Sequence, residues 1–185
     1  MNLSNVEAVM NKYAKYVIQQ SKSNLSKAKP YPKNGGNLYN SLKYELVDDS
    51  QALIVEFLMA DYGEFVDQGV RGKNPNALPQ NAKYYGKQKA PNSPYKFGGM
   101  KTKGLRAAIN RWTVKKNLDG VRDKKGKFLP RKTMQYLITR SIYLSGIKPT
   151  LFFSKPFVAG IKKYELDLTK AFISDIESRM VYGEK

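Results

Sequence analysis

The sequence contains no cysteine and no histidine among its 185 residues. A chain without cysteine has no disulfides and no thiolate metal ligands, which fits a reducing compartment. A chain without histidine lacks the usual general base, the usual catalytic triad and most zinc sites. Long apolar runs are also missing, because no segment approaches the ~20 apolar residues that span a membrane. The N-terminal residues do not have the pattern of a signal peptide, so we expect no membrane partner.

Positive charge is what the sequence has in excess. It contains 33 Lys and Arg residues but only 15 Asp and Glu residues, a net charge of +18. Residues 71–132 hold 18 of the basic residues and 2 of the acidic ones, whereas residues 1–70 have a net charge of −1. A field concentrated in this way attracts polyanions, and nucleic acid is the first candidate. The alternative is a solvated basic loop that only serves solubility.

Hydrophobic spacing predicts a long helix near the N-terminus, followed by a β-hairpin. Ser4 and Glu7 have the spacing of a capping box, and the helix that they begin runs to about Leu25. Alternating apolar and polar residues predict one strand over 42–46. The more apolar segment 52–59 predicts a second, more buried strand. The short connection between the two strands makes the pair antiparallel.

Three further helices are predicted in the second half of the chain. Apolar residues at helical spacing place one over about 105–112 and another over about 134–146. The last helix begins at Ser154 and is expected to bury a continuous apolar stripe. The members of this stripe are Phe157, Ile161, Tyr164, Leu168, Phe172, Ile176 and Met180. The predicted fold class is therefore α+β, with a small antiparallel hairpin-based sheet packed against long N- and C-terminal helices.

The segment 71–104 interrupts these elements with four prolines and five glycines. It shows no helical or strand period, and a connection of this length in a compact domain is usually functional or disordered. We predict an extended basic arm within a single domain of residues 1–185. Its aromatic residues could stack on nucleic-acid bases, but we favour a role as anchors on a neighbouring subunit. These residues are Tyr84, Tyr85, Tyr95 and Phe97.

Three carboxylates, Asp61, Glu64 and Asp67, follow the second strand at intervals of three residues. Such a cluster could bind a hard cation, as in phosphodiester nucleases. Acidic residues are also favoured in the first turn of a helix, where they interact with the helix dipole. The glycine-rich segments nearby do not have the spacing of a phosphate-binding loop. We favour a structural corner, and we predict no catalytic residue, no metal, no cofactor and no small-molecule ligand.

The order of these elements resembles that of the head–tail joining, or tail-completion, proteins of tailed bacteriophages. The resemblance is carried by the segments 37–42 (NLYNSL), 62–70 (YGEFVDQGV), 146–153 (GIKPTLFF) and 155–157 (KPF). The first is similar to the Gly-x-Leu-x-x-Ser segment that leads into the hairpin in that family. The last is similar to the Arg-Pro-Phe segment before the family's final helix, with Lys155 in place of Arg. The resemblance spans most of the chain, and the long basic arm departs from the shorter family members.

The resemblance implies a structural protein without enzymatic activity. Members of this family form closed rings in the neck of the virion, between the portal side and the tail, and DNA passes through the lumen. By analogy we expect a homo-oligomeric ring of sixfold or twelvefold symmetry at the head–tail junction, made in the cytoplasm of the bacterial host. Its partners would be portal or adaptor proteins, tail proteins and the double-stranded DNA of the channel. The alternative is a DNA-binding or metal-dependent DNA-processing protein that uses the basic middle third directly.

A ring requires a head-to-tail interface between its subunits. The acidic corner is expected to turn Tyr62, Phe65 and Val66 inward and to leave its carboxylates for basic residues of the next subunit. The predicted contacts with a subunit or partner are Glu64, Asp67, Arg71, Lys73, Tyr84, Tyr85, Tyr95 and Phe97. A tight basic turn is expected to project into the DNA channel through Arg122, Lys124, Lys125 and Lys127.

Overall fold

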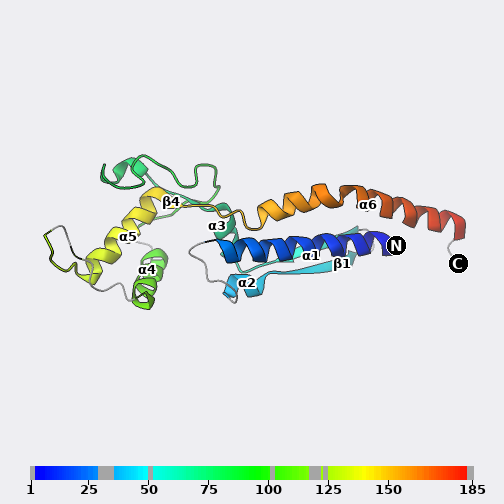
Figure 1. Cartoon of the computed structure of the whole chain (residues 1–185), viewed down its shortest axis with the longest axis horizontal. Coiled ribbons are helices and arrows are strands. Elements are labelled where there is room, and N and C mark those ends of the chain that lie inside the picture. Colours follow the sequence, from blue (N-terminus) through cyan, green and yellow to red (C-terminus); the bar gives the residue numbers. More distant parts are fainter. Residues whose placement is uncertain are drawn as a thin grey trace. The chain divides into compact units, whose positions relative to one another are not determined.

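The structure of the protein is a computed structural model (Figure 1). It describes residues 3–28, 36–49, 52–100, 103–116, 122 and 125–182. The architecture is α+β, with a small antiparallel hairpin and long N- and C-terminal helices. Where the sequence predicts a single domain, the chain forms two compact units. Unit 1 contains residues 1–67 and 150–185, and unit 2 contains residues 68–149.

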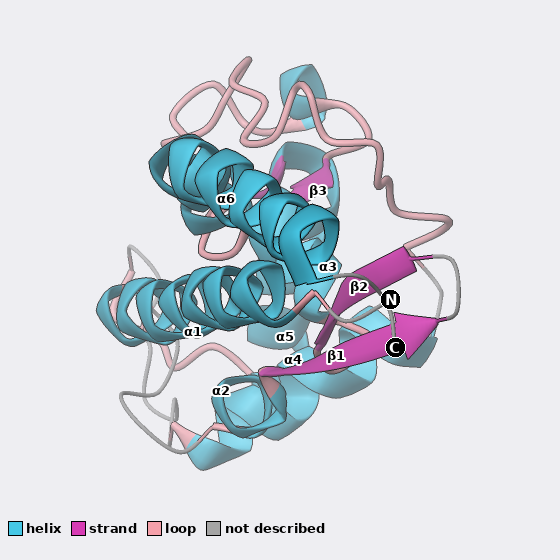
Figure 2. Ribbon diagram, turned by 90° about the vertical axis from the view of Figure 1, so that its right-hand side faces the viewer, coloured by secondary structure: helices cyan, strands magenta, loops and turns pink. Residues whose placement is uncertain are grey.

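Unit 1 is built on two long helices, α1 (Ser4–Lys27) and α6 (Ser154–Tyr182), which lie side by side and antiparallel (Figure 2). Gly160 is buried at their contact, where an added Cβ atom would lie only 2.7 Å from a ring carbon of Tyr13. The Tyr13 ring also makes an edge contact with Tyr164, at a centroid distance of 6.3 Å. The absence of a side chain at Gly160 therefore lets the two helices approach closely.

The start of α1 is stabilised by a carboxylate that is distant in the sequence and lies near the C-terminal end of α6. The predicted capping box does not form, since Leu3 occupies the N-cap position and provides no side-chain hydrogen bond. Instead, the buried Asp175 of α6 accepts hydrogen bonds from the backbone N–H groups of Asn5 and Val6, at 3.2 and 3.0 Å. The N-terminal N–H groups of a helix need such acceptors, and a carboxylate also interacts favourably with the helix dipole. Tertiary contact thus replaces the local cap.

The predicted hairpin is confirmed as β1 (Lys43–Asp49) and β2 (Ala52–Leu58), and a short helix, α2 (Asn37–Ser41), precedes it. Tyr44 pairs with Phe57 on the inner face, where the Phe57 ring contacts Tyr13 of α1 at a centroid distance of 6.0 Å. As expected, the second strand is the more buried one, although only by a single half-buried position. Its side chains alternate between half-buried and exposed, because only one face of the sheet is covered by helices.

The core of unit 1 lies where α1, α2 and the helix α3 (Gly63–Gln68) meet the segment that precedes α6. Phe152, in that segment, is fully buried. The other buried members of the cluster are Leu25, Leu38, Leu42 and Val66. The core is therefore formed mainly by residues outside the apolar stripe of α6.

The predicted core stripe of α6 is only partly correct. Phe157 and Leu168 are half-buried, but Ile161 and Phe172 are 47% and 50% exposed. The residues that α6 buries are small or polar, and they include Gly160, Ala171 and Asp175. Close helix packing selects small residues at the contact, so the apolar stripe lies beside the contact and remains half open to solvent.

Unit 2 contains two helices, α4 (Lys103–Lys115) and α5 (Arg131–Ser145). It also contains a 3-10 turn, η1 (Pro75–Ala77), and the short antiparallel pair β3 (Val70–Arg71) and β4 (Gly146–Ile147). Helices α4 and α5 pack against each other. A polar group lies at this contact, where the buried Gln135 amide donates to the Asn110 side-chain oxygen at 2.7 Å.

The predicted extended arm is folded onto its own unit. The backbone N–H of Lys73 donates to the carbonyl of Tyr143, and that of Lys89 to the carbonyl of Ser145, both at 2.9 Å. These carbonyls belong to the last turn of α5, where a helix has no internal donors for them. Leu78 and Ala90 are buried along the same segment. The loop therefore satisfies the C-terminal end of α5 and buries apolar side chains of its own.

Two phenylalanines test the revised core. Phe152→Ala is expected to lower the free energy of unfolding by about 3–5 kcal/mol, because it leaves a cavity in a closed core. Phe172→Ala is expected to cost less than about 1 kcal/mol, because half of that side chain is already in solvent. Urea denaturation followed by circular dichroism measures both values. Equal losses for the two variants would show that the α6 stripe is core after all.

Candidate interaction surfaces

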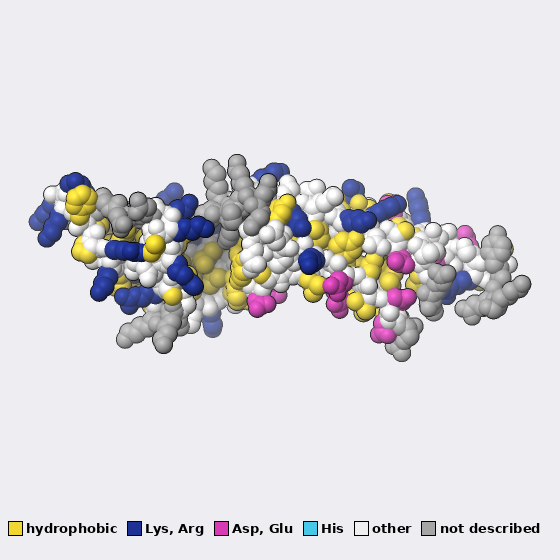
Figure 3. Space-filling view, turned by 90° about the horizontal axis from the view of Figure 1, so that it is seen from below, with side chains coloured by type: hydrophobic (Ala, Val, Ile, Leu, Met, Phe, Trp, Pro, Cys, Tyr) yellow, Lys and Arg dark blue, Asp and Glu magenta, His cyan; other side chains and the backbone are white. Residues whose placement is uncertain are grey.

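The two units differ sharply in charge. Unit 1 contains 13 basic and 13 acidic residues and is neutral, whereas unit 2 contains 20 basic and 2 acidic residues. The whole net charge of +18 is therefore carried by unit 2. In Figure 3 the visible face of unit 2 shows Lys and Arg side chains, and Asp and Glu side chains gather over unit 1. The excess of charge predicted for the middle third thus belongs to a folded unit.

The outer face of the hairpin carries the most unusual pairing in unit 1. Glu45 of β1 lies directly opposite Glu56 of β2, and both are exposed. Like charges at opposed positions destabilise a sheet. Within the described part of the chain, neither carboxylate has a hydrogen-bond or ion-pair partner. The adjacent opposed pair on this face, Val47 and Ile54, is apolar and also exposed.

Helix α4 has a similar concentration of like charge in unit 2. The side of α4 that contains Ile109 and Thr113 is buried. The opposite side contains Arg111 and Lys115, which are exposed and one helical turn apart. Like charges at this spacing are unfavourable in a helix. Both units therefore present a pair of like charges to solvent.

The acidic corner serves a structural purpose. Asp67 is buried, and its carboxylate accepts hydrogen bonds from the backbone N–H groups of Phe153 and Ser154, at 2.8 and 3.2 Å. It also accepts a hydrogen bond from the Ser154 hydroxyl. Asp67 thus caps the start of α6 within its own chain. The prediction that it pairs with a basic residue of another subunit is wrong, because this position is occupied and buried.

The side chains around Asp67 are arranged differently from the prediction. Val66 is buried as expected, but Tyr62 and Phe65 are each 43% exposed, so the aromatic residues of this corner do not both turn inward. Glu64 is exposed on the first turn of α3, as a subunit contact would need to be. Both oxygens of Asp67 face the start of α6, so this corner does not present three carboxylates to one cation.

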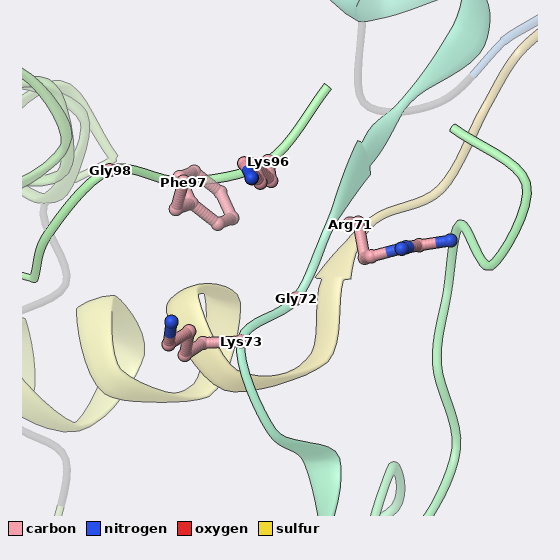
Figure 4. Close-up of a pocket in the computed structure, with 6 residues that line it drawn as sticks. All are labelled: Arg71, Gly72, Lys73, Lys96, Phe97 and Gly98. Atoms are coloured by element: carbon pink, nitrogen blue, oxygen red, sulfur yellow. The ribbon is translucent and has the colours of Figure 1, made fainter. Parts of the chain in front are cut away.

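A basic pocket of about 400 Å³ opens in unit 2 (Figure 4). Lys73 lies at its edge, whereas the Arg71 side chain points away and its Nε donates to the Pro91 carbonyl at 3.2 Å. Gly72 permits the close packing here, since an added Cβ atom would lie 2.3 Å from the carbonyl oxygen of Leu144. The lining residues are Arg71, Gly72, Lys73, Lys96, Phe97 and Gly98. The predicted contacts Arg71, Lys73 and Phe97 are thus brought together, although Arg71 is already engaged.

The predicted aromatic anchors are used mainly inside unit 2. Phe97 packs against Tyr143 of α5 at a centroid distance of 5.9 Å, and the ammonium of Lys89 lies 4.0 Å from the ring centroid of Tyr84. Burial lowers the pKa of Lys89. Tyr95 is half-buried, and its carbonyl accepts the N–H of Arg71. Tyr85 is exposed and available as an anchor for a partner.

The structure describes part of the predicted basic turn, namely residue 122 and residues 125–127. Arg122, Lys125 and Lys127 are exposed, and Lys124 lies outside the described residues. The Arg122 guanidinium lies 4.0 Å from the ring centroid of Phe128 and donates to the carbonyl of Gly126 at 3.0 Å. Gly126 has a φ of +80°, which glycine adopts readily in a tight turn. Three of the four residues predicted to face the channel are therefore exposed to solvent.

The sequence analysis missed four of the charged residues on these surfaces: Glu45, Glu56, Arg111 and Lys115. The sequence nevertheless contains a pattern that could have identified each pair. Placing the turn of the hairpin at residues 50 and 51 and counting outward sets position 45 opposite position 56. The spacing of four residues between Arg111 and Lys115 places them on one side of the predicted helix.

Comparisons with protein-family models, with curated proteins and with solved structures found no match to this chain. Over the residues that the structure describes, no helix has the length and apolar content needed to cross a bilayer. In the same residues, no three acidic side chains converge on a site that could hold a metal ion. The functional argument therefore depends on the surfaces themselves.

The role of Asp67 can be tested by comparing it with Asp61, an exposed carboxylate six residues earlier. Asp67→Ala is expected to lower the free energy of unfolding by about 2–3 kcal/mol, because two backbone N–H groups lose their acceptor. Asp61→Ala is expected to change it by less than about 0.5 kcal/mol. Thermal and urea denaturation provide the measurement. If Asp67→Ala left the free energy of unfolding unchanged, Asp67 would not be a stabilising cap of α6.

Proposed function

We propose that this protein is a ring-forming structural component of the head–tail connector of a tailed bacteriophage. In this proposal it joins the portal side to the tail around the DNA channel and has no enzymatic activity. The order of its elements along the chain supports the proposal. A long helix comes first, followed by a hairpin, an acidic corner and a basic segment, and the chain ends with a long helix that begins with Ser-Lys-Pro-Phe. The virion is its place of function, with portal or adaptor proteins and tail proteins as neighbours.

The segregation of charge is the observation that carries this proposal. A closed ring needs two different surfaces on each subunit, so that one surface of a copy meets the other surface of the next. Here one unit is neutral and exposes carboxylates on a sheet face, and the other unit carries the entire net charge of +18. Two copies can therefore associate head to tail with complementary charge. A symmetric contact between two basic units would be repulsive.

The basic turn of residues 122–128 is the part that we assign to the DNA channel. Arg122, Lys125 and Lys127 are exposed there and can contact phosphates. A conduit for moving DNA is better served by few phosphate contacts than by many, because each contact adds to the affinity. The remaining positive charge is then available for contacts with protein.

The alternative function is direct DNA binding or metal-dependent DNA processing by the basic unit. Its basic composition fits DNA binding equally well. The processing variant needs a cluster of carboxylates around a metal. The corner at Asp61, Glu64 and Asp67 does not provide that cluster, since Asp67 is committed to the start of α6. Magnesium-dependent cleavage of a DNA duplex by the purified protein would favour this alternative.

The oligomeric state tests the proposal most directly. Purified protein is expected to form a closed ring of six or twelve copies, either alone or on portal-containing particles. Mass photometry gives the copy number, and negative-stain electron microscopy shows whether the assembly is closed. A monomer at every concentration, both alone and with purified connectors, would overturn the proposal.

The assignment of the basic turn makes a separate prediction. Replacing Arg122, Lys124, Lys125 and Lys127 by Gln is expected to leave ring assembly unchanged and to weaken binding to a DNA duplex. The slope of log affinity against log salt should fall by about 0.9 for each phosphate that the variant no longer neutralises. A variant with four exposed lysines of unit 1 changed to Gln (Lys12, Lys15, Lys162 and Lys170) is the control for charge alone. Loss of assembly in the turn variant would assign the turn to a protein contact instead.

A further inference from the structure

We propose that the outer face of the β1–β2 hairpin of one copy docks on the outer face of α4 of the next copy. The contact consists of Glu45 and Glu56 of the hairpin facing Arg111 and Lys115 of the helix. This inference rests on the proposed ring, and it names the two surfaces that close it. The occupant of the hairpin face is therefore a second copy of this chain.

The outer face of the hairpin combines like charges with exposed apolar side chains, and the one cation of the two strands, Lys43, lies opposite Leu58 at the far end of this face from the tip. Two exposed carboxylates, Glu45 and Glu56, lie directly opposite each other, at a position where like charges destabilise the sheet. The neighbouring pair, Val47 and Ile54, exposes apolar side chains beside them. A cationic and apolar surface placed on this face would neutralise the carboxylates and cover the apolar pair.

The outer face of α4 has the complementary chemistry. Arg111 and Lys115 are exposed one turn apart, so their positive charges oppose each other in the isolated helix. The same side of the helix contains Gly104, Ala107 and Ala108, all exposed. Small side chains permit a strand to approach the helix backbone, and they leave the two cations as the main features of this face.

The spacing of the charges on the two faces is similar. Opposed Cβ atoms of an antiparallel pair are about 4.5–5.5 Å apart. Cβ atoms at i and i+4 on a helix are about 5–6 Å apart. Each carboxylate can therefore face one cation at the same time. Because the opposed pair lies across the strands and the i, i+4 pair lies along the helix, α4 crosses the strands in this arrangement. Val47 and Ile54, which follow the glutamates toward the tip of the hairpin, then lie beside the helix, where one of the exposed apolar residues that flank the two cations, Trp112 or Val114, can meet them.

The charge balance of the chain favours a second copy over another partner. The chain already contains both halves of the contact, and the acidic half is in the neutral unit and the basic half in the unit of charge +18. Both like-charge pairs are relieved of their repulsion in one association step. Because each copy has one surface of each kind, the contact repeats from copy to copy in the head-to-tail manner of a ring.

Charge reversal tests the pairing. One variant carries Glu45→Lys and Glu56→Lys, a second carries Arg111→Glu and Lys115→Glu, and a third carries all four changes. The first two are expected to weaken self-association about 100-fold or more, because like charges then meet at the interface. The third is expected to restore assembly, since the charges are exchanged but remain complementary. Mass photometry over a dilution series and sedimentation velocity give the affinities.

Matched controls are available on the same elements. Arg106→Glu with Lys116→Glu makes the same charge change on α4 and just beyond its end, away from the proposed face. Asp48→Lys with Asp61→Lys replaces two acidic residues of unit 1 by lysine. Asp48 lies on β1 three residues from Glu45, so its side chain belongs to the opposite face of the hairpin. Both control variants are expected to assemble like the unchanged protein. If they lose assembly to the same extent, net charge and not this contact controls association.

Because the chain has no cysteine, thiol cross-linking provides a second measurement that does not depend on charge-reversed variants folding. Glu56→Cys and Lys115→Cys are placed on separate chains, which are mixed and treated with a short bismaleimide. A cross-linked dimer is expected, whereas Asp48→Cys mixed with Lys116→Cys should give none. A bismaleimide is used because paired Glu and Lys side chains hold their Cα atoms farther apart than the ~7 Å that a disulfide spans.

The outcomes separate this inference from the function on which it rests. If the unchanged protein forms rings but the reversal variants also form them, the surfaces are wrong and the ring stands. If both reversals disrupt assembly and the fourfold exchange does not restore it, the two faces do not meet each other. If the unchanged protein is a monomer throughout, the proposed ring itself fails. Restoration by the exchange together with the specific cross-link would establish the contact.

Discussion

Unit 1 depends on the placement of two buried carboxylates relative to helix starts. Asp67 accepts hydrogen bonds from the backbone N–H groups of Phe153 and Ser154 at the start of α6. Asp175, near the other end of α6, accepts them from the first turn of α1. Each interaction joins segments that are far apart in the sequence. A helix start without an acceptor leaves N–H groups unsatisfied, which is costly when they are buried. The positions of α1 and α6, the two helices that support the hairpin, are therefore fixed by charge-assisted hydrogen bonds as well as by apolar packing.

The sequence predicted the elements better than it predicted their contacts. The hairpin, the α+β class and the start of α6 at Ser154 follow from local periodicity and turn residues, and the structure confirms them. The capping box at Ser4 was wrong because a local motif competes with any tertiary acceptor, and here Asp175 takes that position. The role of Asp67 was missed for the same reason. Spacing along the chain cannot show which distant N–H groups a carboxylate will meet.

The apolar stripe of α6 illustrates a second limit. Periodicity identifies the most apolar side of a helix, but the partner helix determines which side is buried. At the contact with α1 the close approach requires Gly160, so the buried line passes through small residues and shifts away from Phe172. Among the candidate surface residues, exposure of the basic turn could be read from composition. The opposition of Glu45 and Glu56 required a register, which depends on the position of the turn.

The folded loop of unit 2 has a consequence for the entropy of association. Its N–H groups at Lys73 and Lys89 are tied to the last carbonyls of α5, so this part of the positive charge is carried by an ordered scaffold. A flexible arm would lose backbone freedom on binding, at a cost of about 1–2 kcal/mol for each residue that becomes fixed. A preordered loop has given up much of its backbone freedom before any partner arrives. Its encounter with a neighbour therefore resembles the docking of two rigid bodies, with a heat-capacity change that reflects buried surface and little coupled folding.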